Sequence, residues 1–546
     1  MKKITAALLS MILISAMMLT GCVGGVDTPE GTSDDTVADT LDNGKVETPK
    51  DTSDKTGSDD KKPTVNAGKY TVKETYMPES VSSQMKDLFE NQKAKFITYT
   101  YGSSPYVIRD VYTISNCKLL SITIPVSKTL SADGNGDLYF TITVGNNSWH
   151  KISEKVRYVY TIYINVDEYD LPANTEGVNK WLKVDLTEYD IVLSATETIG
   201  FGDPADTLIP AYIGNGDTSN AAQQLIENEF PQMRGFVSKM GIGGTGQTGV
   251  SRGTLIYDFE WERSYKDEDA YKAAVAAEEE YQRVLAEVKE KYKGKKLSIL
   301  GDSISTFEGY SNNTSYNSTI GSNAVYYFKS SGGLNGQGLY DHRDTYWYRL
   351  IEDLEMELCV NNSWSGSKVL DTNHMPSRAE QLHNNNGENP DVIIFYMGIN
   401  DLHNKSAMGD LYAILQSKTD TRSDDVKIAE WFATVSKSNM STFEQAYALS
   451  LKAMTDKYPD AEVWCMTLNV NHDSRFTTTA MNQYNRCITA LAKYFGVNVI
   501  NQQEGYITSG NCTPYSVDNK GLHPSPTGHA LMEKHIIETF YKEIEE

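Results

Sequence analysis

Five short apolar runs, separated by stretches with helical character, constrain the fold of the C-terminal half more than any other feature. The runs cover residues 297–300, 358–361, 392–396, 462–468 and 497–500, and the helical stretches cover 346–357, 442–457, 480–495 and 527–544. Short continuous apolar runs predict strands that are buried on both faces. Their alternation with helices predicts a parallel sheet. We therefore predict an α/β domain with a doubly wound parallel sheet over residues 294–546.

Residues 69–265 follow a different pattern, with runs rich in β-branched and aromatic residues at 111–114, 119–124, 138–144, 156–164 and 255–261. These runs partly alternate and are separated by Gly, Asn and Asp, which predicts an antiparallel β-sandwich with one helix at 220–230. Asp133, Asn135 and Asp137 have the spacing of a calcium loop. Leu138 and Val144 stand where that loop needs its glycine and its bidentate glutamate, so a hairpin turn is favoured.

The N-terminus has the pattern of an export signal. A basic start, an apolar stretch over residues 4–19 and small residues before Cys22 predict a signal peptide over residues 1–21. Its last four residues resemble a bacterial lipobox, which implies lipid attachment to Cys22; an ordinary signal peptide is the alternative. Residues 22–68 are acidic, polar and poor in large apolar side chains, which predicts a disordered tether.

Composition excludes several classes of protein. A net charge of −23 argues against a nucleic-acid partner and against electrostatic docking on anionic lipid. Besides Cys22 there are five cysteines without a Cys-x-x-Cys pair, so neither a disulfide scaffold nor a zinc cluster is predicted. His374, His403 and His523 lack the spacing of a metal site, and we predict no metal and no cofactor. Residues 266–293 are rich in Ala, Glu and Lys without Gly or Pro, which predicts a connecting helix.

Four polar motifs follow predicted strands or precede the last helix. They are Gly301-Asp302-Ser303, Ser365-Gly366-Ser367, Gly398-Ile399-Asn400-Asp401 and Leu522-His523-Pro524. Ser, Gly, Asn and His in this order resemble the SGNH (GDSL-like) hydrolase family. The resemblance covers residues 294–546 and implies a flavodoxin-like sheet of the SGNH-hydrolase type and the hydrolysis of esters.

Acyl transfer needs a nucleophile, a base and donors for the oxyanion. Ser303 supplies the hydroxyl group and His523 the imidazole. The donors would be the backbone N–H groups of Ser303 and Gly366 and the side-chain amide of Asn400. Similar enzymes carry an aspartate three residues before the histidine, where this chain has Lys520. Either Asp518 orients the ring from a bulged loop, or a backbone carbonyl does and the site is a Ser–His dyad.

The functional prediction is a serine esterase, lipid-anchored outside the cytoplasm, that removes short acyl groups, most simply acetyl, from polysaccharide. The membrane contact would be the lipid on Cys22, and the partner an acylated polysaccharide. Polar insertions at 310–344 and 403–440 would form walls or lids of the cleft. Alternatives are a lipase, a thioesterase, a peptidoglycan O-acetyl esterase, or a non-catalytic glycan-binding lipoprotein. The β domain would either bind glycan or act as a spacer.

Overall fold

The computed structural model describes residues 70–77, 79–90, 99–101, 106–107, 116–126, 138–146, 156–164, 169–170, 180–194, 197–201, 207–209, 238–239, 254–255, 258–311, 325–327, 339, 342–469, 475, 477–513, 515–518 and 520–545. Several predictions lie outside these residues: the signal peptide 1–21, lipidation of Cys22, the tether 22–68, the turn at 133–137, the strand at 111–114 and the helix at 220–230. No helix in the described part of the chain is both long and apolar enough to cross a bilayer.

A parallel sheet of five strands forms the centre of the C-terminal domain, in the order β15-β14-β16-β17-β18. The strands are β14 (Lys296–Gly301), β15 (Glu357–Ser363), β16 (Val392–Tyr396), β17 (Glu462–Met466) and β18 (Asn498–Ile500). The order is that of a flavodoxin-like doubly wound sheet, so the predicted parallel sheet is confirmed. Gly301 is in register with Ser363 and Tyr396, so three strands end at the same level.

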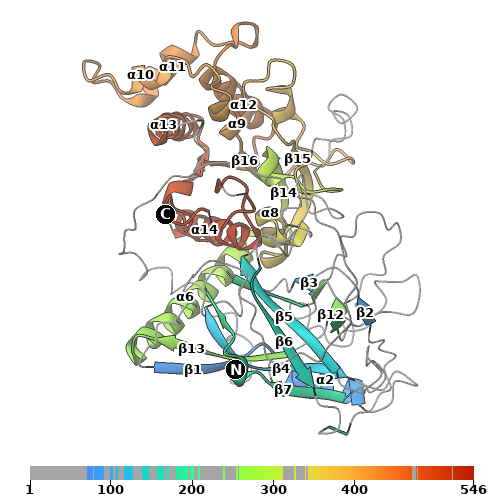
Figure 1. The fold of residues 1–546 in the computed structure, drawn as a ribbon. Coiled ribbons are helices and arrows are strands. Elements are labelled where there is room, and N and C mark those ends of the chain that lie inside the picture. Colours follow the sequence, from blue (N-terminus) through green and yellow to red (C-terminus); the bar gives the residue numbers. More distant parts are fainter. Residues whose placement is uncertain are drawn as a thin grey trace, which may run out of the picture.

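Helices cover both faces of this sheet (Figure 1). Helices α8 (Tyr346–Asp353) and α14 (Pro526–Glu545) pack together on one side, while α9 (Ile399–His403), α12 (Phe443–Lys457) and α13 (Thr478–Tyr494) lie on the other. Helices α10 (Leu411–Leu415) and α11 (Asp424–Phe432), from the second predicted insertion, pack against α13. All five residues of β16 are buried, as expected for a strand covered on both faces.

Helix α6 (Glu268–Tyr292) confirms the predicted connecting helix and belongs to the same core. It begins at Asp267, whose side chain accepts the N–H of Ala270 at 2.8 Å, and it ends before Gly294, which has φ +73°. Tyr292 is fully buried, donates its hydroxyl hydrogen to Glu462 Oε1 at 2.5 Å, and its ring lies 4.7 Å from that of Phe540. The helix therefore packs on the hydrolase domain.

The N-terminal region contains two antiparallel sheets. One has the order β1-β13-β4-β7 with β8 beside β4, and the other has the order β3-β9-β5-β6. Their strands are β1 (Tyr70–Thr75), β3 (Tyr106–Val107), β4 (Cys117–Val126), β5 (Leu138–Asn146), β6 (Val156–Ile164), β7 (Lys180–Asp185), β8 (Val192–Leu193), β9 (Glu197–Phe201) and β13 (Asp258–Tyr265). The antiparallel strands predicted at 119–124, 138–144 and 156–164 are confirmed. The packing of the two sheets as a sandwich stays a prediction.

The remaining elements are short. Two small ladders pair β10 (Thr207–Ile209) with β2 (Tyr99–Tyr101) and β11 (Ser238–Lys239) with β12 (Thr254–Leu255). The run predicted at 255–261 is divided between β12 and β13, and α2 (Glu79–Glu90) is a helix where none was predicted. Single 3₁₀ turns are η2 (Thr187–Tyr189), η4 (Ser303–Ser305), η6 (His342–Asp344), η7 (Ser377–Glu380), η8 (Lys437–Asn439) and η9 (Gln502–Glu504). In the described part of the chain, five cysteines are buried and belong to no disulfide: Cys117, Cys359, Cys465, Cys487 and Cys512.

Candidate active site

The turn that follows β14 presents Ser303 at the C-terminal edge of the sheet. Asp302 caps η4, because its Oδ1 accepts the N–H of Ile304 at 3.1 Å. Gly301 is required at the strand end, since a Cβ there would lie 2.6 Å from Ser305 Oγ and 2.8 Å from Ser363 Oγ. Only 6% of Ser303 is exposed. The turn thus holds the hydroxyl group in a nearly buried position at the end of a central strand.

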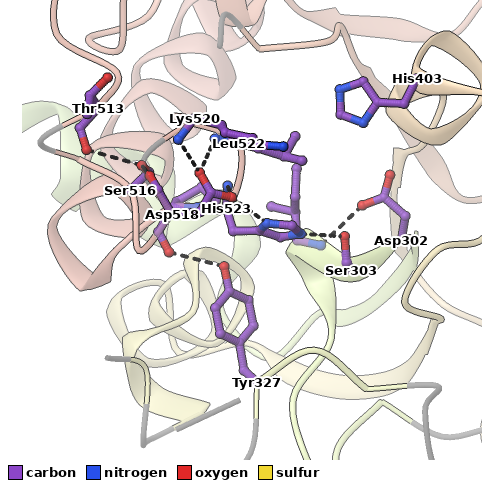
Figure 2. Close-up of polar contacts among 12 residues, drawn as sticks. Asp302, Ser303, Tyr327, His403, Thr513, Ser516, Asp518, Lys520, Leu522 and His523 are labelled. Carbon is purple, nitrogen blue, oxygen red and sulfur yellow. Dashed lines mark hydrogen bonds and ion pairs between the residues drawn. The ribbon is translucent and has the colours of Figure 1, made fainter. Parts of the chain in front are cut away.

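Two hydrogen bonds join Ser303, His523 and Asp518 in one line (Figure 2). Ser303 Oγ lies 2.9 Å from His523 Nε2, and His523 Nδ1 lies 2.7 Å from Asp518 Oδ2. A carboxylate can only accept, so Nδ1 carries the hydrogen and the Nε2 of the neutral ring is the acceptor for the serine hydroxyl. The His523 and Asp518 side chains are 12% and 17% exposed. This is the geometry in which an imidazole can take the proton of a serine hydroxyl.

The loop before His523 is folded around the Asp518 carboxylate. Oδ1 accepts the backbone N–H groups of Lys520 at 3.1 Å and Leu522 at 2.9 Å, and Oδ2 also accepts the N–H of His523 at 3.1 Å. These bonds bring residue 518 to the Nδ1 edge of the ring although it stands five residues before His523 in the sequence. Of the two alternatives for the ring's partner, the structure has Asp518.

The charge state of Asp518 follows from the same contacts. Burial raises the pKa of this carboxyl, but the hydrogen bond and charge of His523, together with the backbone N–H groups, outweigh burial and lower it below its usual value. The group is therefore ionised at neutral pH. An ionised Asp518 can accept the Nδ1 hydrogen and so fix the orientation of the ring.

Potential oxyanion donors lie beside Ser303. The loop after β15 turns at Gly366, whose φ of +77° favours glycine although a Cβ would meet no atom within 4 Å. Asn400 Nδ2 donates to the carbonyl oxygen of Ser367 at 3.0 Å, which fixes the amide and leaves its second hydrogen available. Within the described turns and loops, the backbone N–H groups of Ser303 and Gly366 donate to no backbone carbonyl oxygen. All three predicted donors are thus placed around one edge of the sheet.

Two buried groups hold these loops in place and were not predicted from the sequence. Asp401 Oδ2 accepts the N–H of Val369 at 2.7 Å and its Oδ1 the N–H of Leu370 at 2.9 Å, which ties α9 to the Gly366 loop. Arg378 is fully buried and donates to the carbonyl oxygens of Gly301 at 3.2 Å and Asn362 at 2.6 Å. Arg378 therefore joins the ends of β14 and β15. A lone arginine in an irregular segment carries no sequence signal for this role.

Two buried carboxyls beneath the site have raised pKa values. Burial raises the pKa of Asp302 to about 7, with a further contribution from the negative charge of Asp401. Burial also raises the pKa of Asp401 to about 6, partly offset by its two backbone donors. Each group therefore resists ionisation in the folded protein.

The other histidines have separate partners. His374 Nδ1 lies 2.7 Å from Asp371 Oδ2, and His403 Nδ1 accepts from an Arg475 guanidinium N–H at 3.0 Å. His529 is fully buried, and burial lowers its pKa to about 3. Among the described residues, no three His, Cys, Asp or Glu side chains are grouped so that they could hold a metal ion.

A nearly buried serine, hydrogen-bonded to a histidine at the strand-end edge of a doubly wound sheet, is typical of the SGNH class of hydrolases. Residues 295–538 match the family model of the GDSL-like lipase/acylhydrolases. This match covers the C-terminal domain and supports the ester-hydrolase family that the sequence motifs implied. No curated protein matches the chain.

Solved structures resemble parts of the chain. Two proteins provisionally assigned as GDSL-like lipases, from Bacteroides ovatus and Bacteroides uniformis, are 23% and 22% identical with TM-scores of 0.32 and 0.31. Each match covers 46% of this chain and 99% or 96% of the other protein. The psychrotrophic esterase EstA from a Pseudoalteromonas species, in a structure inhibited by monoethylphosphonate, is 12% identical with a TM-score of 0.26, over 46% of this chain and 100% of its own.

Proposed function

We propose that the protein is a serine esterase in which Ser303 is the nucleophile, His523 the general base and Asp518 the residue that orients His523. The observation that carries this proposal is the hydrogen-bonded line from Ser303 Oγ through the imidazole to Asp518 Oδ2, at 2.9 and 2.7 Å. Both distances allow proton transfer and orientation without rearrangement of the loop. The lowered pKa of Asp518 keeps the carboxylate charged while the ring becomes positive.

The reaction proceeds in two halves. Ser303 Oγ attacks the ester carbonyl while His523 Nε2 takes the hydroxyl proton, and the carbonyl oxygen becomes an oxyanion. The N–H groups of Ser303 and Gly366 and the free amide hydrogen of Asn400 stabilise that charge, each donor contributing about 3 kcal/mol in comparable enzymes. His523 then gives its proton to the departing alcohol. Water, activated by the same ring, releases the acyl group from Ser303.

The substrate we propose is a short acyl ester, most simply acetyl, on a polysaccharide outside the cytoplasm. The export signal and Cys22 support an extracytoplasmic, lipid-anchored enzyme. The polar insertion at 310–344 favours a polar carrier over a long acyl chain, and the N-terminal β domain offers a second surface for glycan. Lipases, thioesterases and peptidoglycan O-acetyl esterases use the same chemistry on other esters.

Acetate release from acetylated xylan tests this proposal. We expect the soluble protein (residues 69–546) to release acetate and the Ser303→Ala variant to be slower by at least about a thousandfold. Acetyl-peptidoglycan and p-nitrophenyl esters of two chain lengths, assayed beside xylan, identify a different carrier or acyl group. A wild-type protein that cleaves no ester, or a Ser303→Ala variant that keeps full activity, would contradict the proposal and favour the non-catalytic glycan-binding reading.

A further inference from the structure

The His523 imidazole is in face-to-face contact with an aromatic ring that the proposed mechanism does not use. The ring of Tyr326 is stacked on it, with centroids 3.6 Å apart and an interplanar angle of 9°. Tyr326 is 8% exposed and belongs to the polar insertion between Tyr310 and Asp344. Ser303 and Asp518 contact the imidazole only at its edge, through its two nitrogen atoms. Tyr326 covers one face.

The backbone of Tyr326 is tied to the nucleophile turn. Its N–H donates to Thr306 Oγ1 at 2.8 Å, and the Thr306 hydroxyl in turn donates to the carbonyl oxygen of Ser303 at 2.8 Å. This places the ring of Tyr326 in a fixed relation to Ser303. The Thr306 hydroxyl therefore links the backbone of Tyr326 to the backbone of Ser303 through two hydrogen bonds.

The next residue, Tyr327, is tied to both sides of the site. Its carbonyl oxygen accepts the N–H of Glu308 at 2.9 Å. Its hydroxyl donates to the carbonyl oxygen of Pro524, the residue directly after His523, at 3.1 Å. The dipeptide Tyr326-Tyr327 therefore bridges the turn that carries the nucleophile and the loop that carries the base.

We propose that Tyr326 is a positioning residue for ester hydrolysis: its ring holds the His523 imidazole in the plane that joins Ser303 to Asp518 and faces the imidazolium that forms during acyl transfer. This inference rests on the proposed esterase function. Two in-line hydrogen bonds leave the ring free to tilt about the line between its nitrogen atoms, and a stacked neighbour prevents that tilt. A positive imidazolium is also attracted to the π face of a tyrosine ring, most strongly where water is excluded.

Replacing the ring tests the proposal through kcat and KM. Tyr326→Leu removes the stack, and we expect kcat to fall about tenfold while KM changes less than about twofold. Tyr326→Phe keeps the stacked face and should restore most of kcat. Tyr541→Leu is the matched control, because the Tyr541 ring also faces a positive group, the guanidinium of Arg283 at 5.1 Å, but lies outside the site and its insertions. This control should leave kcat within about twofold of wild type, because the substitution does not alter the surroundings of the His523 imidazole.

A fluorophosphonate that reacts with activated serines separates this inference from the choice of substrate. Its rate of covalent attachment to Ser303 requires the base but no particular ester, and should also fall about tenfold in Tyr326→Leu. The final stoichiometry should stay at one label per chain, because a correctly folded site still reacts to completion. Esterase activity missing from the wild type would refute the proposed substrate, and this labelling rate would still decide the role of Tyr326.

Three results would overturn the inference. The first is a Tyr326→Leu protein with unchanged kcat and labelling rate beside an inactive Ser303→Ala protein. The second is a rise in KM alone, which would make Tyr326 a substrate contact. The third is an equal loss of kcat in Tyr326→Phe and Tyr326→Leu, which would assign the effect to the hydroxyl group.

Discussion

Asp518 accepts four N–H groups, three from the backbone and one from the His523 ring. The same carboxylate therefore shapes the loop and holds the ring of the proposed base. Lys520 occupies the position where similar enzymes have their aspartate, yet it contributes its backbone N–H to Asp518. A shift of two residues in sequence is thus compensated by a tight turn around the side chain.

Asp518→Asn should lower kcat/KM by about three orders of magnitude, because an amide can offer its N–H to Nδ1 and stabilise the wrong ring tautomer. Steady-state kinetics on a p-nitrophenyl ester measures this. Asp371→Asn is the matched control, since it alters another Asp–His pair of the same 2.7 Å length and should stay within about threefold of wild type. A loss below tenfold in Asp518→Asn would favour the Ser–His dyad.

Asp302 should make stability depend on pH. In the folded protein its pKa of about 7 lies above its ordinary value. The contribution of Asp302 to the free energy of unfolding is therefore fully present below about pH 4 and is lost as pH rises through 7. Asn at this position still accepts the Ile304 N–H and has no charge to desolvate. Relative to wild type, Asp302→Asn should therefore gain roughly 2–4 kcal/mol of unfolding free energy between pH 5 and 8. Urea titrations at the two pH values measure it, and parallel pH dependence in both proteins would contradict it.

Among the elements, α9 and the loop after β15 carry the proposed oxyanion donors, and Asp401 connects the two. Asp401→Asn leaves one of the N–H groups of Val369 and Leu370 facing an amide donor, so the Gly366 loop should shift. Because oxyanion donors act in the transition state, kcat should fall about 10- to 100-fold at pH 8 with little change in KM. Asp410→Ala, which removes the acceptor of the Trp431 indole N–H in the nearby insertion, is the control. An effect on KM alone would show that the loop binds substrate instead.

The strands and the polar motifs at their ends were predictable because they depend on local patterns. A strand buried on both faces must be a continuous apolar run, and a strand followed by a tight turn leaves Gly, Ser or Asn at its end. For this reason β14, β15, β16, β17 and β18, and the placement of Ser303, Gly366 and Asn400, followed from the sequence. The strand predicted at 462–468 ends two residues earlier in the structure, at Met466. Thr467 and Leu468 continue the sequence pattern, but they lie beyond the residues of β17 that pair in register with the neighbouring strands.

The contacts that hold the site together were not predictable, because they join residues far apart in sequence. Tyr326 and His523 are separated by 197 positions, and nothing in an irregular polar insertion indicates which tyrosine reaches the base. Asp518 remained one of two alternatives, because the turn that brings it to the edge of the ring is made by backbone N–H groups. The run Tyr326-Tyr327-Phe328 was the one signal in that insertion, an aromatic cluster among polar residues.

At the scale of the whole molecule, α6 joins two parts with different roles. It follows β13 of the N-terminal sheet, yet its buried residues Val284, Val288 and Tyr292 lie in the hydrophobic core of the hydrolase domain. Arg283 also donates to the Tyr541 hydroxyl of α14 at 3.0 Å. The helix is therefore structurally part of the catalytic half, although the sequence marks it only as a connector.

Two truncations test this division. A chain of residues 266–546 keeps α6 and should retain kcat/KM on p-nitrophenyl acetate within about threefold of residues 69–546. A chain of residues 294–546 uncovers the core that Tyr292 and Val288 fill, so its thermal midpoint should fall by at least about 10 °C or the protein should aggregate. Calorimetry and the small-ester assay measure both. Equal stability of the two truncations would show that α6 contributes nothing to the catalytic half.

The same 266–546 chain also tests the N-terminal β domain, because the active site should be intact in it. If that domain binds glycan, removing it should lower acetate release from insoluble acetylated xylan about tenfold while activity on small soluble esters is spared, since only the tethered domain raises the local concentration of the enzyme on the solid. The acetate released per enzyme from insoluble and from solubilised xylan gives the ratio directly. Equal loss on both substrates would assign the domain to packing, and no loss on either would favour a spacer role.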